Sequence, residues 1–471
     1  MIRKTKIVCT IGPASSSLEK LDKLISAGMN VARLNFSHGT QDGHREVIHR
    51  IRKLAAKADK PVAIIQDLAG PKIRIGPICD GKIHLQPGKS FTLTTAPVPG
   101  DASTVSVNYP RLPKDVRIGD PLLLSDGDLE LNIVKIEGNN ILCRVVTGGE
   151  LSSHKGINLP TRSLKIPILT EKDRNDVLFG IEQGVDYFAL SFVRNVEDIR
   201  EARKIISESG GAIPIIAKIE KHEALNHLEK IIDEVDGIMV ARGDLGVEIP
   251  LEQIPLIQKN MIQLANNRGK PVITATQMLR SMVDNPRPTR AEVSDAANAI
   301  LDGTDAVMLS EETAVGAYAV ESVKVLDRIA RDVENKGYPG RGNTPPEPAI
   351  GPSVPEAVAH AACDLARIIQ ATCLITFTHS GSTARLVSKF RPAIPIVAPT
   401  PAKKTYRELA LSRGVFPLLS PHVKDTDEMI ASVLQLTEKT GMAKSGEKVV
   451  ITAGLPLFVS GTTNLIKAET I

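Results

Sequence analysis

The sequence contains no tryptophan, few aromatic residues and no strong excess of either charge. Aromatic residues make up 3% of the 471 positions, which argues against nucleic-acid binding through base stacking. The net charge is +4, from 58 Lys and Arg against 54 Asp and Glu. Because the two signs are interspersed, we expect neither a nucleic-acid nor a membrane surface.

Cysteine is also scarce, and its spacing excludes common zinc and disulfide patterns. The number of cysteines is odd, and no pair has CxxC spacing. We therefore predict reduced thiols in a reducing compartment. The five residues are Cys9, Cys79, Cys143, Cys363 and Cys373.

No apolar run approaches the length that spans a bilayer. The first residues lead directly into the strand-like segment Ile7 to Ile11, without the pattern of a signal peptide. We therefore expect a cytoplasmic protein. A hydrophobic content of 42% over 471 residues is enough for roughly three globular domains.

Strand-like and helical segments alternate through most of the chain. Eight such alternations in residues 1–70 and 168–335 predict an α/β fold with a (β/α)8 TIM barrel rather than an open sheet. A capping box at Thr289 to Glu292 marks the start of one helix. The predicted strands are Lys6 to Ile11, Val31 to Asn35, Val62 to Asp67, Asp186 to Ser191, Ile213 to Lys218, Gly237 to Val240, Pro271 to Ala275 and Ala306 to Leu309.

Two further regions differ from this pattern. Residues 71–167 contain short alternating runs between Gly and Pro turns, which predict an inserted all-β lid domain. Residues 336–353 are rich in glycine and proline and are interpreted as a linker. Residues 354–471 alternate helix and strand again, and we expect a C-terminal open α/β domain with a parallel sheet.

Two acidic residues follow buried strands directly. Glu220 ends the run Lys218-Ile219-Glu220, and Asp244 follows the apolar run Gly237 to Ala241. A charge at the end of a buried strand needs a partner. The partner is either a neighbouring charge or a divalent ion. Because the nearby ligands are oxygens and not His or Cys, an ion here would be Mg²⁺ or Mn²⁺.

Polar residues also close the other barrel strands. In a TIM barrel these strand ends form one mouth, where active sites lie. Arg33, Lys218 and a metal ion together suit phosphoryl transfer. Taken singly, each of these residues has an ordinary structural explanation. The other polar strand ends include Asn35, Ser37, His38, Asp67 and Thr276.

Six motifs, taken together and in order, resemble the pyruvate kinase family over essentially the whole chain. The resemblance implies transfer of the phosphoryl group of phosphoenolpyruvate to ADP, giving pyruvate and ATP, in a homotetramer. The motifs are Thr5 to Pro13, Arg33 to Gly39, Lys218 to Glu220, Met239 to Glu248, Ala275 to Leu279 and Asn285 to Glu292.

The resemblance also implies a role for each matching residue. Glu220 and Asp244 are expected to hold magnesium. Arg33 and Lys218 would contact the phosphoryl group, and Thr276 would serve the proton route. Gly243, Asp244 and Thr276 would hold the substrate carboxylate. The residues expected near the nucleotide are Asn35, His38, Arg74 and Lys155, with Asp126 in the lid.

The chain departs from many relatives after the third barrel strand. Their Asp-Thr-Lys-Gly-Pro-Glu reads here Asp67-Leu68-Ala69-Gly70-Pro71-Lys72. In such relatives the residues matching Asn35, Ser37, Asp67 and Leu68 hold potassium. We hypothesise that the Lys72 ammonium replaces that charge and makes activity independent of potassium. The alternative is a surface Lys72 beside an intact ion site.

By the same resemblance, the segment Thr378 to Thr383 is expected to bind an allosteric sugar phosphate. The segment Gly461 to Asn464 would close this site. No arginine for a second phosphate is evident there, which favours a monophosphorylated effector. A plain Ser/Thr helix cap is the alternative. The residues expected to contact the effector are Thr378, Ser380, Gly381, Ser382 and Thr383.

Two other functions remain open at this point. One is a magnesium-dependent lyase acting on pyruvate or phosphoenolpyruvate, which would need neither the lid nor Lys155. The other is a catalytically silent sensor that binds sugar phosphate through residues 378–384. Retention of Arg33, Lys218, Glu220 and Asp244 argues against the sensor.

Overall fold

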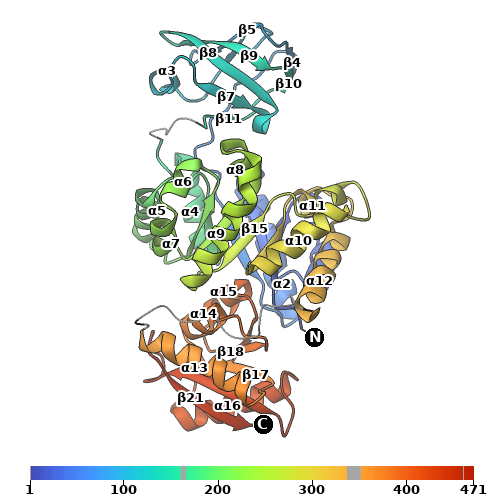
Figure 1. The fold of residues 1–471 in the computed structure, drawn as a ribbon, viewed down its shortest axis with the longest axis vertical. Helices are drawn as coiled ribbons and strands as arrows, with labels where there is room; N and C mark the ends of the chain where they lie inside the picture. Colours follow the sequence, from blue (N-terminus) through green and yellow to red (C-terminus); the bar gives the residue numbers. More distant parts are fainter. Residues whose placement is uncertain (1, 161–165, 337–350, 352, 460) are drawn as a thin grey trace.

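The computed structural model describes residues 2–160, 166–336, 351, 353–459 and 461–471. Three parts follow one another along the longest axis of the molecule (Figure 1). A small β domain lies at one end, a barrel with its helices in the middle, and an α/β domain at the other end. The predicted linker 336–353 falls mostly outside the described residues.

The central part is a closed barrel of eight parallel strands, which confirms the predicted fold class. Neighbouring strands follow the order β1-β16-β15-β14-β13-β12-β3-β2 around the barrel. Each predicted strand is present, with ends shifted by two residues or fewer. The bounds are β1 Lys6–Ile11, β2 Val31–Asn35, β3 Ala63–Asp67, β12 Tyr187–Leu190, β13 Ile215–Ile219, β14 Gly237–Ala241, β15 Val272–Ala275 and β16 Ala306–Leu309.

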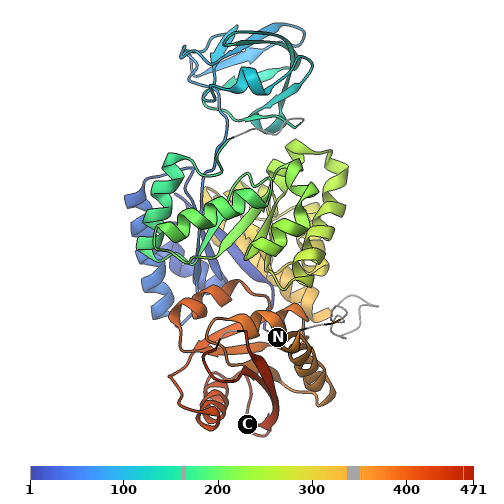
Figure 2. The same ribbon diagram turned by 90° about the vertical axis from the view of Figure 1, so that its left-hand side faces the viewer.

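Helices surround the barrel on its outside (Figure 2). Their ends follow sequence signals: Thr289 forms the predicted capping box with Glu292, and Gly28 ends a helix at φ 118°. The bounds are α1 Leu18–Ala27, α2 Gln41–Lys57, α4 Glu171–Gln183, α5 Val196–Glu208, α6 His222–Asn226, α7 Leu228–Glu234, α8 Arg242–Glu248, η2 Leu251–Gln253, α9 Ile254–Asn267, η3 Arg280–Val283, α10 Arg290–Asp302, α11 Glu311–Ala314 and α12 Ala319–Lys336.

Apolar side chains fill the barrel interior, so the barrel is a packed core and not a channel. Val8, Ile65 and Met239 belong to this core. Ala410 and Leu411, from the C-terminal domain, belong to the same cluster. Segment η4 (Leu409–Leu411) therefore covers the end of the barrel that faces the C-terminal domain.

The β domain has its own hydrophobic core, which includes Phe91, Leu122 and Leu131. It contains a six-stranded sheet in the order β11-β7-β8-β9-β5-β6 and the separate pair β10-β4. The sequence did not predict the short strands β7, β10 and β11. The bounds are β4 Lys82–Leu85, β5 Ser90–Thr94, β6 Thr104–Ser106, α3 Leu112–Asp115, β7 Pro121–Leu124, η1 Ser125–Gly127, β8 Leu129–Glu137, β9 Asn140–Thr147, β10 Gly149–Ser152 and β11 Ile157–Asn158.

The C-terminal domain is an open α/β domain, but its sheet is not wholly parallel as predicted. The strand order is β19-β18-β17-β20-β21, and β21 pairs with β20 antiparallel. Strand β21 lies at the sheet edge and is largely half-buried or exposed, so it lacks the apolar run of a buried strand. The bounds are α13 Val354–Ile368, β17 Cys373–Thr376, α14 Ser382–Lys389, β18 Ile396–Thr400, α15 Lys403–Glu408, β19 Val415–Leu419, α16 Thr426–Lys439, β20 Lys448–Gly454 and β21 Thr463–Thr470.

Two remaining features concern the chain as a whole. All five cysteines are free thiols, and Cys79 alone among them is exposed. None of the helices in the described ranges combines the length and the hydropathy needed to cross a bilayer.

Candidate active site

Buried charges gather where β2 and β3 end, at the barrel mouth that faces the β domain. Arg33 on β2 donates from Nε to Oδ2 of Asp67 on β3 at 2.6 Å, and from a terminal nitrogen to Oγ1 of Thr10 at 2.9 Å. Burial opposes ionisation of Asp67, yet the charges of Lys218 and Arg33 hold its pKa below the ordinary value. Asp67 is thus an ionised carboxylate that orients two cations.

Lys218 on β13 lies between the carboxylates of Asp67 and Glu220. Its Nζ is 2.8 Å from Oε1 of Glu220 and 3.3 Å from Oδ1 of Asp67. It also donates to the Ser191 hydroxyl at 2.8 Å. Burial lowers the pKa of Lys218, but the two carboxylates outweigh burial and raise it above its ordinary value. Lys218 is therefore a fixed positive charge at the mouth.

Glu220 is 1% exposed, and its charge is not fully balanced. Burial first, and then the charge of Asp244, raise its pKa to about 7 in spite of the Lys218 ammonium. One oxygen accepts from the Phe192 N–H at 3.2 Å. The other, Oε1, is buried and has no hydrogen-bond partner with good geometry, although Lys218 Nζ is near. A buried carboxylate with a free lone pair beside a second carboxylate suits a divalent cation.

Asp244 and Gly243 lie in the first turn of α8, which begins directly after β14. The Gly243 N–H donates to Oγ1 of Thr276 at 2.8 Å, which joins this turn to the end of β15. Thr276 and Gln277 have φ of 69° and 55°, in the left-handed region that side chains rarely adopt. Arg242 holds this backbone by donating to the Ala275 and Thr276 carbonyls at 3.1 and 2.7 Å.

Lys72 lies in the segment that leaves the barrel for the β domain. Its Nζ is 3.6 Å from Oδ1 of Asp244 and 3.4 Å from Oδ1 of Asp126 in η1. The Lys72 side chain is 22% exposed. It therefore points to the site and bridges the barrel and the β domain, instead of pointing away into solvent.

The residues predicted around a monovalent ion lie at the ends of β2 and β3. Asn35 Oδ1 accepts from the Ser37 N–H at 3.1 Å, and the Leu68 carbonyl accepts from Ser191 at 2.7 Å. Within the described part of the chain, Lys72 takes part in neither of these contacts; its ion pairs are with Asp126 and Asp244. The structure thus places Lys72 on the Asp244 side of the mouth.

The residues predicted near a nucleotide lie on both sides of the hinge, which is the segment around Lys72 that leads from the barrel into the β domain. Arg74 and Gly156 form an isolated antiparallel bridge, which sets Arg74 close to Lys155. Arg74 donates to the His154 carbonyl at 3.1 Å, and Lys155 is exposed. Across the opening, Asn35 is half-buried and His38 is exposed on the barrel.

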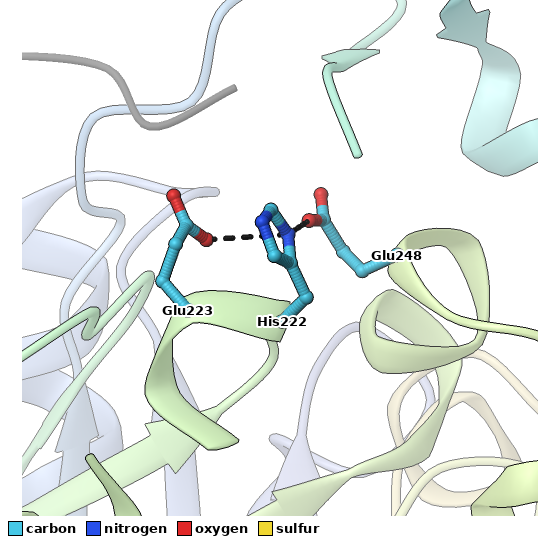
Figure 3. A group of neighbouring side chains, drawn as sticks. All are labelled: His222, Glu223 and Glu248. Atoms are coloured by element: carbon cyan, nitrogen blue, oxygen red, sulfur yellow. Dashed lines mark hydrogen bonds and ion pairs between the residues drawn. The ribbon is translucent and has the colours of Figure 1, made fainter. Parts of the chain in front are cut away.

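A cluster of His222, Glu223 and Glu248, which the sequence did not predict, lies beside this hinge (Figure 3). Glu248 accepts from Lys221 at 2.6 Å, contacts His222 at 3.0 Å, and accepts from Asn158 of the β domain at 3.2 Å. The hydrogen bond to Glu248 raises the pKa of His222. Because Lys221 already balances the charge of Glu248, we interpret this cluster as a contact between the barrel and the β domain.

No sequence signal of ordinary strength would have revealed this cluster. Lys221, His222 and Glu223 follow Glu220 directly, but Glu248 comes 26 residues after His222 and Asn158 comes 64 residues before it. Only folding brings them together. They adjoin a cavity, open to solvent, between barrel and β domain, whose lining includes Lys72, Asn158, Lys221 and Glu223.

The segment predicted to bind an effector forms a second, separate cavity in the C-terminal domain. Its lining includes Thr378, Ser380, Ser382 and Thr383, together with Gly461 and Thr462. Within the segment, the Gly381 N–H donates to Oγ1 of Thr378 at 2.9 Å. The Thr383 and Thr463 hydroxyls are 2.8 Å apart, so the two predicted segments meet.

Comparison with known proteins identifies the family. Residues 2–323 match the barrel domain of pyruvate kinase, and residues 356–468 match its alpha/beta domain. The chain is 44% identical to a pyruvate kinase of Clostridium acetobutylicum, with full coverage of both chains. It is 46% identical to pyruvate kinase 2 of Synechocystis, covering 100% of this chain and 79% of that one.

A solved structure agrees with these sequence comparisons. The crystal structure of a pyruvate kinase from Cryptosporidium parvum superposes with a TM-score of 0.92 and is 40% identical. The match covers 99% of this chain and 96% of the other. With both domains and nearly the full length matched, the chain belongs to the pyruvate kinase family.

Proposed function

We propose that the chain transfers the phosphoryl group of phosphoenolpyruvate to ADP, giving pyruvate and ATP, and that Arg33, Lys218 and Thr276 are its catalytic residues. Membership of the family supports these two substrates. The observation that carries the assignment of roles is Lys218, a buried ammonium fixed between Asp67 and Glu220 at the open barrel mouth. Such a fixed cation stabilises charge that develops during transfer.

Glu220 and Asp244 would hold the divalent cation that the family requires. Two carboxylates are a typical protein contribution to a magnesium site, in which substrate oxygens and waters complete the coordination. Mg²⁺ or Mn²⁺ bound there would neutralise negative charge on the substrate. The raised pKa of Glu220, and its oxygen without a hydrogen bond, support this assignment.

The residues of the chain would then divide the work of transfer. Arg33, held by Asp67 and Thr10, would bind the phosphoryl oxygens. Lys218 would stabilise the enolate that the departing phosphoryl group leaves behind. The backbone of Gly243 and Asp244, with the Thr276 hydroxyl, would hold the substrate carboxylate. Thr276 would also pass a proton toward the methylene carbon.

Nucleotide binding would involve the hinge and the lid. Arg74 and Lys155 carry positive charge on the β-domain side of the opening, and Asn35 and His38 lie on the barrel side. A nucleotide between these two sides would draw the lid toward the barrel. Such closure excludes water from the transferring group.

Potassium independence is a further part of this proposal. The Lys72 ammonium, 3.6 Å from Asp244, adds a positive charge at the mouth where many relatives have a glutamate. From the Asp244 side of the mouth, it would supply the charge that a potassium ion supplies in those relatives at the region of Asn35, Ser37, Asp67 and Leu68.

Regulation and assembly complete the proposal. The cavity around residues 378–383 would bind a monophosphorylated sugar or nucleotide through the loop before α14. A homotetramer, a cytoplasmic location and the boundaries 1–70 with 168–335, 71–167, 336–353 and 354–471 stay predictions. Sedimentation with and without a sugar phosphate would test the assembly.

An assay for ADP-dependent release of pyruvate tests the main proposal. The parent chain is expected to release pyruvate only when phosphoenolpyruvate, ADP and Mg²⁺ are all present. Glu220→Gln is expected to lose at least a hundredfold in rate, while the surface control Glu208→Gln keeps the parent rate. Pyruvate release without ADP would favour a lyase, and full activity of Glu220→Gln would overturn the metal assignment.

The potassium proposal has its own test. Turnover is measured in potassium and in a large organic cation at equal ionic strength, for the parent and for Lys72→Glu. The parent rate should hardly change, whereas Lys72→Glu should become potassium-dependent. The charge-reversal control Lys89→Glu, on the surface of the β domain, should behave like the parent. A many-fold potassium activation of the parent would refute charge replacement.

A further inference from the structure

A second cleft with an excess of positive charge lies where the barrel meets the C-terminal domain. Helices α14 and α15 separate the barrel from the C-terminal sheet in this region (Figure 1). The cleft is small and open to solvent on one side. Its walls come from the segment before β15, the residue before β16, helix α14 and the segment before β19. The charged and hydroxyl residues that matter are Lys270, Asp305, Arg385, Lys389, Arg391 and Ser412.

Two of the four cations in this lining already have carboxylate partners. Lys389 is 2.5 Å from Oε1 of Glu356 on α13. Arg391 donates to both oxygens of Asp305, at 2.8 and 2.9 Å, and contacts Asn266 as well. These pairs join neighbouring elements, and in the second case the two domains. The charges of Lys389 and Arg391 are thus already balanced by carboxylates within the protein.

The other two cations, Lys270 and Arg385, are bonded only to backbone carbonyls among the contacts of the described residues. Lys270 donates to the Val235 carbonyl at 2.6 Å, and Arg385 donates to the Ser380 carbonyl at 2.8 Å. No carboxylate within the described ranges lies within 4.0 Å of either. Burial first, and then the charges of Arg203 and Arg385, lower the pKa of Lys270 although Asp236 opposes them. An anion placed between the two cations would relieve their repulsion.

Ser412 adds an independent sign of a ligand. This residue lines the cleft, is 3% exposed, and its buried hydroxyl has no hydrogen-bond partner. The Nε of Arg391, in the same lining, is also buried without a partner. Buried polar groups are normally paired, because an unmade hydrogen bond costs free energy. Two unpaired donors and two cations in one cleft match the several acceptor oxygens of a tetrahedral dianion.

We propose that this cleft is a binding site for a phosphate dianion, either free or as the terminal group of a small metabolite, held by Lys270, Arg385 and Ser412. Phosphate fits because its charge matches two cations and its oxygens accept several hydrogen bonds. The space inside the cleft is small, so the phosphate would bind at its open side, which would also accommodate the rest of a phosphomonoester. The barrel supplies Lys270 and the C-terminal domain supplies the other two residues, so the ligand would bridge the two domains.

Arg385 also connects this cleft to the cavity at residues 378–383. Its guanidinium donates to the Ser380 carbonyl, and both cavities share helix α14. An experiment must therefore separate the two cavities. The active site, which would itself bind phosphate, must also be blocked.

Equilibrium dialysis of the full chain against inorganic phosphate tests the proposal. The background variant Thr378→Val/Ser382→Ala removes hydroxyls of the neighbouring cavity, and saturating phosphoenolpyruvate with Mg²⁺, without ADP, occupies the active site. We expect this background to bind one phosphate per chain. Adding Lys270→Met should weaken binding about tenfold or more, and Ser412→Ala should weaken it severalfold. The exposed control Lys439→Met should have no effect.

Two results would overturn the proposal. One is absence of phosphate binding to the background variant at millimolar concentration. The other is equal binding by the Lys270→Met, Ser412→Ala and Lys439→Met variants. Lys270→Gln replaces Lys270→Met if thermal unfolding shows that the latter does not fold. Repeating the dialysis with glycerol 3-phosphate distinguishes the sources, since tighter binding of the monoester identifies a metabolite and weaker binding identifies free phosphate.

Discussion

The two mouths of the barrel are built from opposite kinds of residue. The mouth that faces the β domain carries Arg33, Asp67, Lys218 and Glu220, buried and paired with one another. At the other mouth, η4 inserts Leu411 and its neighbour into the apolar core of the barrel. One mouth is therefore arranged for binding charged ligands, and the other is closed by hydrophobic packing.

The domains that cover these mouths are attached differently. The β domain contacts the barrel through polar groups, such as the half-buried Lys72 near Asp244, and the buried Asn158, which donates to the buried Glu248. The C-terminal domain forms ion pairs with buried barrel carboxylates, including Arg407 with Asp186 at 2.7 Å, and its core joins that of the barrel. We infer that the lid can move during turnover, whereas the C-terminal domain stays fixed and contributes stability.

The largest expected effect is on activity at the charged mouth. Lys218→Met should lower kcat about a thousandfold, because it removes the fixed cation that faces the transferring group. The midpoint of thermal unfolding should fall as well, because Asp67 and Glu220 lose a buried ion-pair partner, so activity is compared per folded molecule. The exposed variant Lys324→Met is the matched control. Pyruvate release and thermal unfolding are measured on the same samples, and a kcat within tenfold of the parent would contradict the assignment.

The opposite result is expected at the apolar mouth. Leu411→Ala should lower the free energy of unfolding by about 2–5 kcal/mol, since it leaves a cavity in the shared core. Activity per folded molecule should remain near that of the parent. Denaturant unfolding checks the first point. Leu419→Ala, at a half-exposed position on β19, is the control and should cost much less.

A pH-dependent effect of intermediate size is expected at the interface between the barrel and the C-terminal domain. Lys6 is buried and donates to the Val415 carbonyl of the C-terminal domain at 2.6 Å. Burial first, and then the charge of Arg3, lower its pKa to about 7. The unfolded chain, with an ordinary lysine pKa, therefore binds more protons than the folded chain between about pH 7 and pH 10.5.

It follows that the contribution of Lys6 to stability rises with pH across this window and is lost as pH falls through 7. Relative to Lys6→Met, the free energy of unfolding of the parent should increase by at most about 1.4 kcal/mol per pH unit. Parallel denaturant titrations at pH 7, 8 and 9 measure the difference. A difference that stays constant with pH would contradict the lowered pKa.

The smallest expected effect is at the lid. Asn158→Ala removes one hydrogen bond between the β domain and Glu248, which keeps its contacts to Lys221 and His222. Stability should fall by less than about 1 kcal/mol. Because the lid would close less readily, KM for ADP should rise about two- to fivefold with little change in kcat. Asn132→Ala, within the β domain, is the control and should leave KM unchanged.

Much of the barrel could be predicted because its signal is local. Buried parallel strands are continuous apolar runs that stop abruptly at charges, as at Lys218 and Arg242. Strands such as β7, β11 and β21 escaped prediction, because they are short or partly exposed and take their order from pairing with distant segments.

Prediction of the site was also limited to what local sequence patterns show. The order of charged residues along the chain determined which side chains end the barrel strands, since parallel strands that close a barrel place all their carboxyl ends at one mouth. Only the tertiary structure decided that Lys72 pairs with Asp244 and Asp126, that Glu248 meets Asn158, and that Leu411 closes the far mouth. Those contacts depend on how separate domains pack. Packing brings together residues that are far apart in the sequence, and no local pattern around either residue predicts its partner.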